Sequence, residues 1–160
     1  MSSETGMEIG VTIQAERPDQ PEALALIDEL EAYLTPLYPD ESRHGYSVEK
    51  LIAQGVAFFV LRKDGEAAGC GGVQFYDGEY AELKRMYVRP RFRGLGLAKR
   101  MLIHLEEFSR SNGLTLVRLE TGIYQKEAVG LYERMGYHSI PPFGAYRPDP
   151  LSLFYEKSLG

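Results

Sequence analysis

Apolar and polar positions alternate at the start of the chain and then change to a helical spacing. Residues 8–14 read EIGVTIQ, an alternation rich in β-branched side chains that predicts a strand. From Pro21 the apolar residues fall three and four positions apart, which predicts a helix that ends before Pro36. Residues 47–54 predict a second, short helix with Ser47 as its N-cap.

The middle of the chain has the pattern of an antiparallel meander. Residues 56–61 and 67–76 are apolar and aromatic runs, and Asp64-Gly65 lies between them. A second Asp-Gly pair at 77–78 leads into residues 80–88. Because Asp-Gly is the strongest short hairpin signal, three consecutive antiparallel strands are expected.

The second half predicts helices and strands in alternation. A helix opens near Gly94 and ends at Asn112-Gly113, a strand covers 115–121, and a helix covers 126–135 before Gly136. A proline-rich loop and a final strand at 151–156 follow. The order predicts an α+β fold, a mixed sheet flanked by helices, in a single domain over residues 1–160.

Composition narrows the class of protein. The chain has 160 residues, 44% of them hydrophobic, and a net charge of −5, as expected for a soluble globular protein that is not a general nucleic-acid binder. It has no run long enough to span a membrane and no signal peptide, so a cytoplasmic location is expected. Cys70 is the only cysteine, and the three histidines are scattered, so neither a disulfide framework nor a metal site is predicted.

One short stretch of this acidic chain is strongly basic, which suggests one polyanionic ligand held at one place. Its glycines, Gly94 and Gly96, follow a strand and open a helix, where backbone amides and the helix dipole favour a phosphate. The basic residues are Lys84, Arg85, Arg89, Arg91, Arg93, Lys99 and Arg100.

Three kinds of phosphate site compete for this segment. A dinucleotide fold expects a third glycine, but residues 94–99 read GLGLAK, and the preceding strands form hairpins. A nucleoside-triphosphate P-loop expects Gly-Lys-Ser/Thr, which is absent. A coenzyme A pyrophosphate site is the third.

Two motifs resemble the GNAT superfamily of N-acetyltransferases. Residues 88–96, VRPRFRGLG, are similar to its cofactor signature, Arg/Gln-x-x-Gly-x-Gly/Ala after a strand. Residues 128–137, AVGLYERMGY, are similar to its second signature, Ala-x-x-Leu-Tyr-Glu-x-x-Gly-Phe/Tyr. The resemblance implies a mostly antiparallel GNAT-type sheet of about seven strands with about four helices, and acetyl-CoA as the acetyl donor.

The resemblance also implies where the donor is held. Backbone groups of Met86 and Val88 would hold the pantetheine arm, and amides from Arg91 to Ala98 would hold the pyrophosphate. The family usually has an asparagine where this chain has Gln125, which is therefore included among the candidate contacts. The candidate donor-binding residues are Met86, Val88, Arg91, Arg93, Gly94, Leu95, Gly96, Leu97, Ala98 and Gln125.

Acetyl transfer to an amine needs a base for the ammonium and an acid for the departing thiolate, but no protein nucleophile. By the resemblance, Glu82 on the strand before the glycines is the candidate base, with Glu120 as second choice, and Tyr132 is the candidate acid. Ion pairing of Glu82 with Lys84 or Arg85 is its alternative role, and core packing is that of Tyr132. Cys70 is expected to be a small buried residue.

These features predict an N-acetyltransferase that acts on a primary amine of a small molecule or peptide. Residues 40–46 and 140–146 are expected to form the acceptor wall, but the acceptor cannot be derived from the fold. The alternative is a non-catalytic acetyl-CoA-binding module that reports donor level to a partner protein. No nucleic acid or membrane partner is expected, and a homodimer formed through an exposed final strand is left open.

Overall fold

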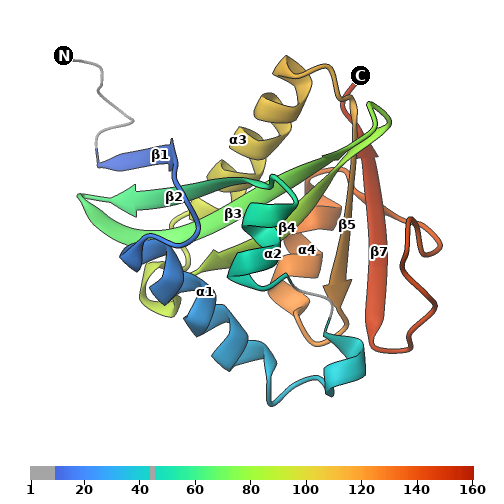
Figure 1. Ribbon diagram of the computed structural model, residues 1–160, viewed down its shortest axis with the longest axis horizontal. Coiled ribbons are helices and arrows are strands. Elements are labelled where there is room, and N and C mark those ends of the chain that lie inside the picture. The colour runs from blue at the N-terminus through green and yellow to red at the C-terminus, as the bar shows by residue number, and fades with distance from the viewer. Residues whose placement is uncertain (1–9, 44–45) are drawn as a thin grey trace.

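A computed structural model describes residues 10–43 and 46–160 of the chain. In this part the strands form one seven-stranded sheet in the order β1-β2-β3-β4-β5-β7-β6 (Figure 1). All neighbouring strands are antiparallel except β4 and β5, which are parallel. The predicted fold class, a mixed and mostly antiparallel sheet with helices, is confirmed.

The elements follow the predicted order closely. The helices are α1 (Pro21–Leu34), α2 (Val48–Ala53), α3 (Leu97–Ser111) and α4 (Lys126–Arg134), with short 3₁₀ turns at Asp40–Ser42 and Pro90–Phe92. The strands are β1 (Val11–Ala15), β2 (Ala57–Lys63), β3 (Glu66–Tyr76), β4 (Tyr80–Val88), β5 (Leu116–Gly122), β6 (His138–Ser139) and β7 (Ser152–Ser158).

Two strands differ from the prediction. Strand β1 begins at Val11 rather than residue 8, and residues 8 and 9 lie outside the described part. Strand β6 was not predicted, because two exposed residues carry no periodic pattern. It leaves β7 between β5 and β6, so the final strand is not the edge strand of the sheet.

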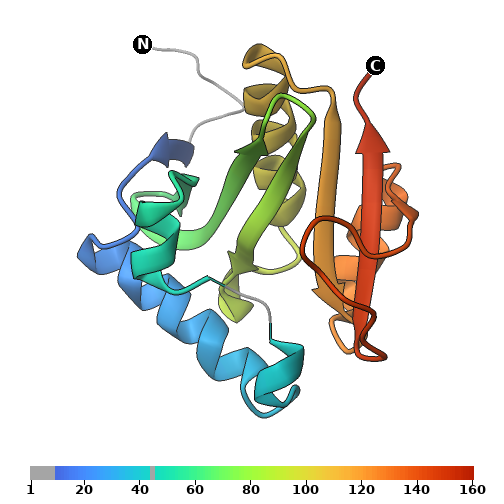
Figure 2. The same ribbon diagram turned by 45° about the vertical axis from the view of Figure 1, so that its right-hand side comes forward.

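The helices cover both faces of the sheet, α1 and α2 on one side and α3 and α4 on the other (Figures 1 and 2). Strand β2 shows how the sequence specifies both layers. Phe58 and Val60 pack with α1 and α2, while Phe59 and Leu61 pack with α3. Successive side chains of a strand point to opposite faces, so an uninterrupted apolar run fits a strand covered on both sides.

Cys70 is the small buried residue that the sequence predicts. It lies on β3 in the core under α1 and is 1% exposed. Burial raises the pKa of its thiol to about 12, so the thiol stays protonated and unreactive at neutral pH.

No helix in the described part of the chain is long and apolar enough to cross a membrane.

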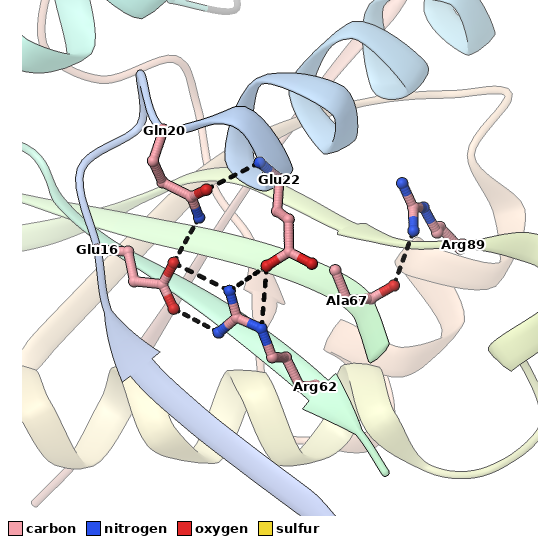
Figure 3. Close-up of polar contacts among 6 residues, drawn as sticks. All are labelled: Glu16, Gln20, Glu22, Arg62, Ala67 and Arg89. Atoms are coloured by element: carbon pink, nitrogen blue, oxygen red, sulfur yellow. Dashed lines mark hydrogen bonds and ion pairs between the residues drawn. The ribbon is translucent and has the colours of Figure 1, made fainter. Parts of the chain in front are cut away.

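A polar network fixes the start of α1 to the sheet (Figure 3). Arg62 of β2 lies between two carboxylates, donating to Glu16 at 3.1 Å and to Glu22 at 2.5 Å, and their pairing raises the pKa of its guanidinium. The Gln20 side chain accepts the Glu22 amide at 2.8 Å and caps the helix, while its Nε2 donates to Glu16. Arg62 and its two partners therefore hold the N-terminal end of α1 against β2.

Replacing Arg62 with alanine is expected to lower the free energy of unfolding by about 1–2 kcal/mol, because it leaves Glu16 partly buried without its cation. Urea unfolding measures the change. The matched control is Arg17→Ala, which removes the exposed Arg17–Asp19 pair and should leave the unfolding midpoint unchanged. Equal midpoints for Arg62→Ala and wild type would contradict a stabilising role for the network.

Candidate active site

A pocket opens where β4 and β5 separate. The two parallel strands pair only through Ala81 with Val117 and Glu82 with Arg118. Beyond these pairs, residues 83–86 of β4 and 119–122 of β5 line opposite sides of the pocket, and α1 lies over it. The other lining residues are Leu30, Glu31, Leu34, Tyr38, Ser42, Arg43, Tyr46, Gln125, Tyr132 and Tyr146.

Strand β4 is distorted at this opening. Its register with β3 shifts between Cys70 and Gly72, and Arg85 has a left-handed backbone with φ of 56°. A non-glycine residue adopts this conformation rarely and at a cost. The Arg85 guanidinium offsets this cost by donating to the Tyr46 carbonyl at 2.8 Å and to Glu31 at 3.0 Å. The distortion therefore lies at the wall of the pocket and is fixed by α1 and the loop before α2.

The glycine segment after β4 has the geometry of an anion site. Gly94 and Gly96 have φ of 82° and 74°, and Gly96 is the N-cap of α3. A Cβ at either glycine would meet nothing within 4 Å, so the space before the helix is open. No described carbonyl accepts a backbone hydrogen bond from the amides of residues 94–99. Free amides at a helix N-terminus can bind a phosphate.

Five of the seven basic residues near this segment, those before Gly94, divide into two groups. The first group forms ion pairs within the fold: Lys84 with Glu82, Arg85 with Glu31, and Arg89 with Glu29. Arg91 and Arg93 are exposed. Arg91 pairs with the exposed Glu66, and the Arg93 Nε donates to the Val88 carbonyl at 3.1 Å. These two side chains remain the candidate phosphate contacts, since an exposed ion pair is readily exchanged for a ligand.

The strand edge offered to the pantetheine arm is partly occupied. Arg89 donates its amide to Ala68 of β3, so the backbone of Val88 faces the opposite side, toward the opening. The Arg93 side chain already holds the Val88 carbonyl there. Met86 lines the pocket. The Val88 amide and the Met86 backbone are therefore the groups that this edge leaves for a ligand.

Glu82 is buried beside the pocket rather than in its wall. Its side chain is 3% exposed, and it is not among the lining residues. Oε2 accepts hydrogen bonds from Lys84 Nζ at 3.0 Å and from the Tyr146 hydroxyl at 2.5 Å. The ion pair with Lys84 was foreseen as the alternative role of Glu82, while the bond to Tyr146 was not. Tyr146 lines the pocket, and only the length of a phenol separates the pocket from this carboxylate.

Tyr132 lies in the wall of the pocket on α4. It is 6% exposed, and its ring contacts Tyr137 edge to face at 5.8 Å. Burial, with a smaller contribution from Glu120, raises the pKa of the phenol, so it is protonated at neutral pH. Its hydroxyl makes no hydrogen bond to residues 10–43 or 46–160. A protonated donor in the pocket wall is available to a ligand.

Glu120 and Gln125 complete the site on the β5 side. Glu120 lines the pocket, unlike Glu82, and its charge acts on both Tyr132 and Tyr146. The Gln125 side chain points back into its own turn, where Oε1 accepts the Gly122 amide at 3.0 Å. Of the expected acceptor wall, Ser42, Arg43, Tyr46 and Tyr146 reach the pocket, and residues 44 and 45 lie outside the described part.

The sequence is similar to known acetyltransferases. The model of the acetyltransferase (GNAT) family matches residues 23–137. The chain is 43% identical over 150 residues to an IAA acetyltransferase from Azospirillum brasilense, covering 93% of this chain and 98% of that one. It is 32% identical over 140 residues to the uncharacterized N-acetyltransferase YsnE of Bacillus subtilis, covering 86% of this chain and 93% of that one.

Solved structures have the same fold. One, described as an acyl-CoA N-acyltransferase from Klebsiella pneumoniae, has a TM-score of 0.80 and 38% identity, covering 94% of this chain and 98% of that one. The PaiA N-acetyltransferase of Thermoplasma acidophilum, solved with coenzyme A, has a TM-score of 0.73 at 19% identity, covering 94% of this chain and 99% of that one. The fold and the sequence matches define the chain as an acyltransferase. It belongs to the acetyltransferase (GNAT) family.

Proposed function

We propose that this protein transfers the acetyl group of acetyl-CoA to a primary amine of a small molecule or peptide, by direct attack in a ternary complex. The observation that carries the proposal is the pocket between β4 and β5, which has Tyr132 in its wall and Glu82 directly behind it. The thiol of Cys70 is buried in the core, so the described part of the chain offers no cysteine for an acetylated enzyme intermediate.

The donor side is built from backbone groups. The free amides after Gly94 suit the pyrophosphate, and the separated edges of β4 and β5 suit an extended arm that hydrogen-bonds like a strand. Arg91 and Arg93 supply positive charge at the surface. Gln125 is proposed as a contact only through its amide nitrogen, because its oxygen is bound to Gly122.

The base is proposed to act on the acceptor, and the acid on the coenzyme A that leaves. Glu82 takes the proton of the acceptor ammonium, and the phenol of Tyr132 protonates the thiolate that leaves. Glu120 is the second candidate for the base, because it lies in the pocket wall itself. The acceptor enters beside Tyr46 and Tyr146, which both line the pocket and whose ring centres lie 3.9 and 5.9 Å from Lys84 Nζ.

Release of free thiol from acetyl-CoA, measured over a panel of amines, tests this function. The panel should include polyamines, amino acids and short peptides. IAA is tested beside the panel, because one relative is named an IAA acetyltransferase. Amine-dependent thiol release is expected. Donor binding without thiol release for any amine would favour the non-catalytic module instead. A single domain over residues 1–160 and a cytoplasmic location stay predictions, and the homodimer stays an open alternative.

Glu82→Gln is expected to lower kcat/KM at least tenfold at neutral pH and by much less at alkaline pH, where the acceptor amine loses its proton unaided. A pH–rate profile of the variant measures this difference. Glu120→Gln is the matched control, since it removes the other carboxylate of the site. A Glu82→Gln profile with wild-type shape, beside an altered Glu120→Gln profile, would transfer the role of base to Glu120.

A further inference from the structure

Tyr146 lies between the pocket and the carboxylate proposed as base. Glu82 is 2% exposed and does not line the pocket, whereas Tyr146 lines it and donates its hydroxyl to Glu82 Oε2 at 2.5 Å. We propose that Tyr146 is a further catalytic residue, which takes the proton of the acceptor ammonium and passes its own proton to Glu82. This inference rests on the proposed function, because it requires Glu82 to be the base.

The loop before β7 is built to hold this phenol in place. Its ring packs edge to face against Phe143 and Phe154, at 5.2 and 5.4 Å between centroids, and its amide donates to the Phe143 carbonyl at 3.1 Å. Phe143 and Phe154 form a small apolar cluster with Tyr80. In Figure 2 this loop reaches from β7 across β5, and the bond to Glu82 places Tyr146 over β4. Two aromatic rings and a hydrogen bond within the loop therefore position the phenol.

Lys84 balances the charge of the receiving carboxylate. Its Nζ lies 3.0 Å from the same Oε2 that accepts the Tyr146 hydroxyl, and 3.9 Å from the centre of the Tyr46 ring. A carboxylate buried without a cation or hydrogen bonds would be costly. Lys84 supplies the cation, and Tyr146 supplies a hydrogen bond to the same oxygen. The Lys84 charge also disfavours an acceptor that remains an ammonium ion beside it.

The chemistry of a phenol suits the transfer. Burial, and then the charge of Glu82 and their hydrogen bond, raise the pKa of Tyr146, so it does not act as a stored phenolate. A phenol has both a lone pair and a proton. As its oxygen forms a bond to a proton of the ammonium, its own O–H bond breaks and that proton moves to Oε2. The products are a neutral amine, a neutral phenol and a protonated Glu82.

Several titratable groups surround this pathway, and each can contribute to the pH dependence of the activity. Glu82 and Lys84 lie on β4, Tyr76 on β3 and Glu120 on β5, and Glu82, Tyr76 and Glu120 all raise the pKa of Tyr146. Tyr46 is connected to Tyr76 by a hydroxyl–hydroxyl contact of 3.2 Å. The test therefore compares variants rather than assigning one pH transition to one group.

Tyr146→Phe keeps the ring packing and removes the shuttle. It is expected to lower kcat/KM about tenfold at neutral pH, with recovery at alkaline pH. The loss should be smaller than that of Glu82→Gln, because water can replace part of the pathway. The double variant Glu82→Gln/Tyr146→Phe should be no slower than Glu82→Gln alone, because both changes interrupt one pathway. Tyr155→Phe is the matched control: it removes another tyrosine–carboxylate bond, to Glu133 at 2.8 Å, and should keep full activity.

The shuttle is overturned if kcat/KM of Tyr146→Phe is within twofold of wild type while Glu82→Gln is slow. It is also overturned if the losses of the two single variants multiply in the double variant. A loss of kcat/KM in Tyr146→Phe that persists at alkaline pH is the third contradicting result. Wild-type activity of Glu82→Gln would instead refute the base of the proposed function, and the shuttle with it. If Tyr146→Phe melts early, Glu82→Asp, which moves the carboxylate away from an intact phenol, should show the same pH-dependent loss. Undiminished activity of Glu82→Asp would count against the shuttle.

Discussion

Tyr132→Phe is expected to lower kcat on the order of 10²-fold, with donor affinity and melting temperature close to wild type. The variant keeps the ring and its contact with Tyr137 and removes only the hydroxyl of a residue that lines the pocket. The phenol makes no hydrogen bond to the described residues, so its loss breaks no bond within them. Its raised pKa keeps the proton on the oxygen until a thiolate forms nearby.

Steady-state kinetics and thermal melting, with chemistry shown to be rate-limiting, measure this effect. Tyr137→Phe is the matched control, because the Tyr137 hydroxyl donates a hydrogen bond of 2.7 Å to the buried Glu106. Neither residue lines the pocket. The control should lose stability and keep kcat, the reverse of the expected pattern for Tyr132. Turnover of Tyr132→Phe within a few-fold of wild type would make Tyr132 a core residue.

Replacing Gly94 or Gly96 with leucine is expected to weaken acetyl-CoA binding at least 10²-fold. A side chain at either position meets no protein atom near its Cβ, so it projects into the space before α3 that the pyrophosphate needs. The left-handed backbone adds about 1–2 kcal/mol of strain, which lowers stability without preventing folding. Calorimetric titration with acetyl-CoA measures the affinity.

Gly113→Leu separates the two effects. Gly113 also has a positive φ, of 85°, and open space around its Cβ, but it follows the C-terminus of α3 rather than preceding its N-terminus. This control should show the same loss of stability with unchanged affinity. Unchanged affinity in both the Gly94 and the Gly96 variants would place the donor elsewhere.

The sequence was sufficient for the four helices and for every strand of the described part except β6. Asp-Gly turns, helical spacing and the glycines at 94 and 96 are local signals, and the elements they predict are present. Side-chain partners were less predictable, because they depend on tertiary contacts. Nothing near Tyr146 in the sequence indicates that it meets Glu82, 64 residues earlier.

The sequence also did not predict the distorted backbone of β4 or the ion pairs that hold some basic residues inside the fold. The left-handed backbone of Arg85 depends on a register shift between two strands and on Glu31 and Tyr46, which hold its side chain. Arg89 lies among the basic residues near the glycines, yet it is bound to Glu29 of α1 at 2.8 Å. A run of like charges in a sequence does not distinguish ligand contacts from residues that connect elements.

The short pairing between β4 and β5 has a mechanical consequence. Two residue pairs join β1–β4 to β5–β7 within the sheet, so the spacing of the two strands beyond these pairs is set by side-chain packing rather than by strand hydrogen bonds. Glu82 stands on one half, and Glu120 with Tyr132 on the other. A donor whose arm bridges both edges would fix the spacing between acid and base. Amide hydrogen exchange in β5 should then slow on donor binding, and donor binding would precede productive binding of the amine.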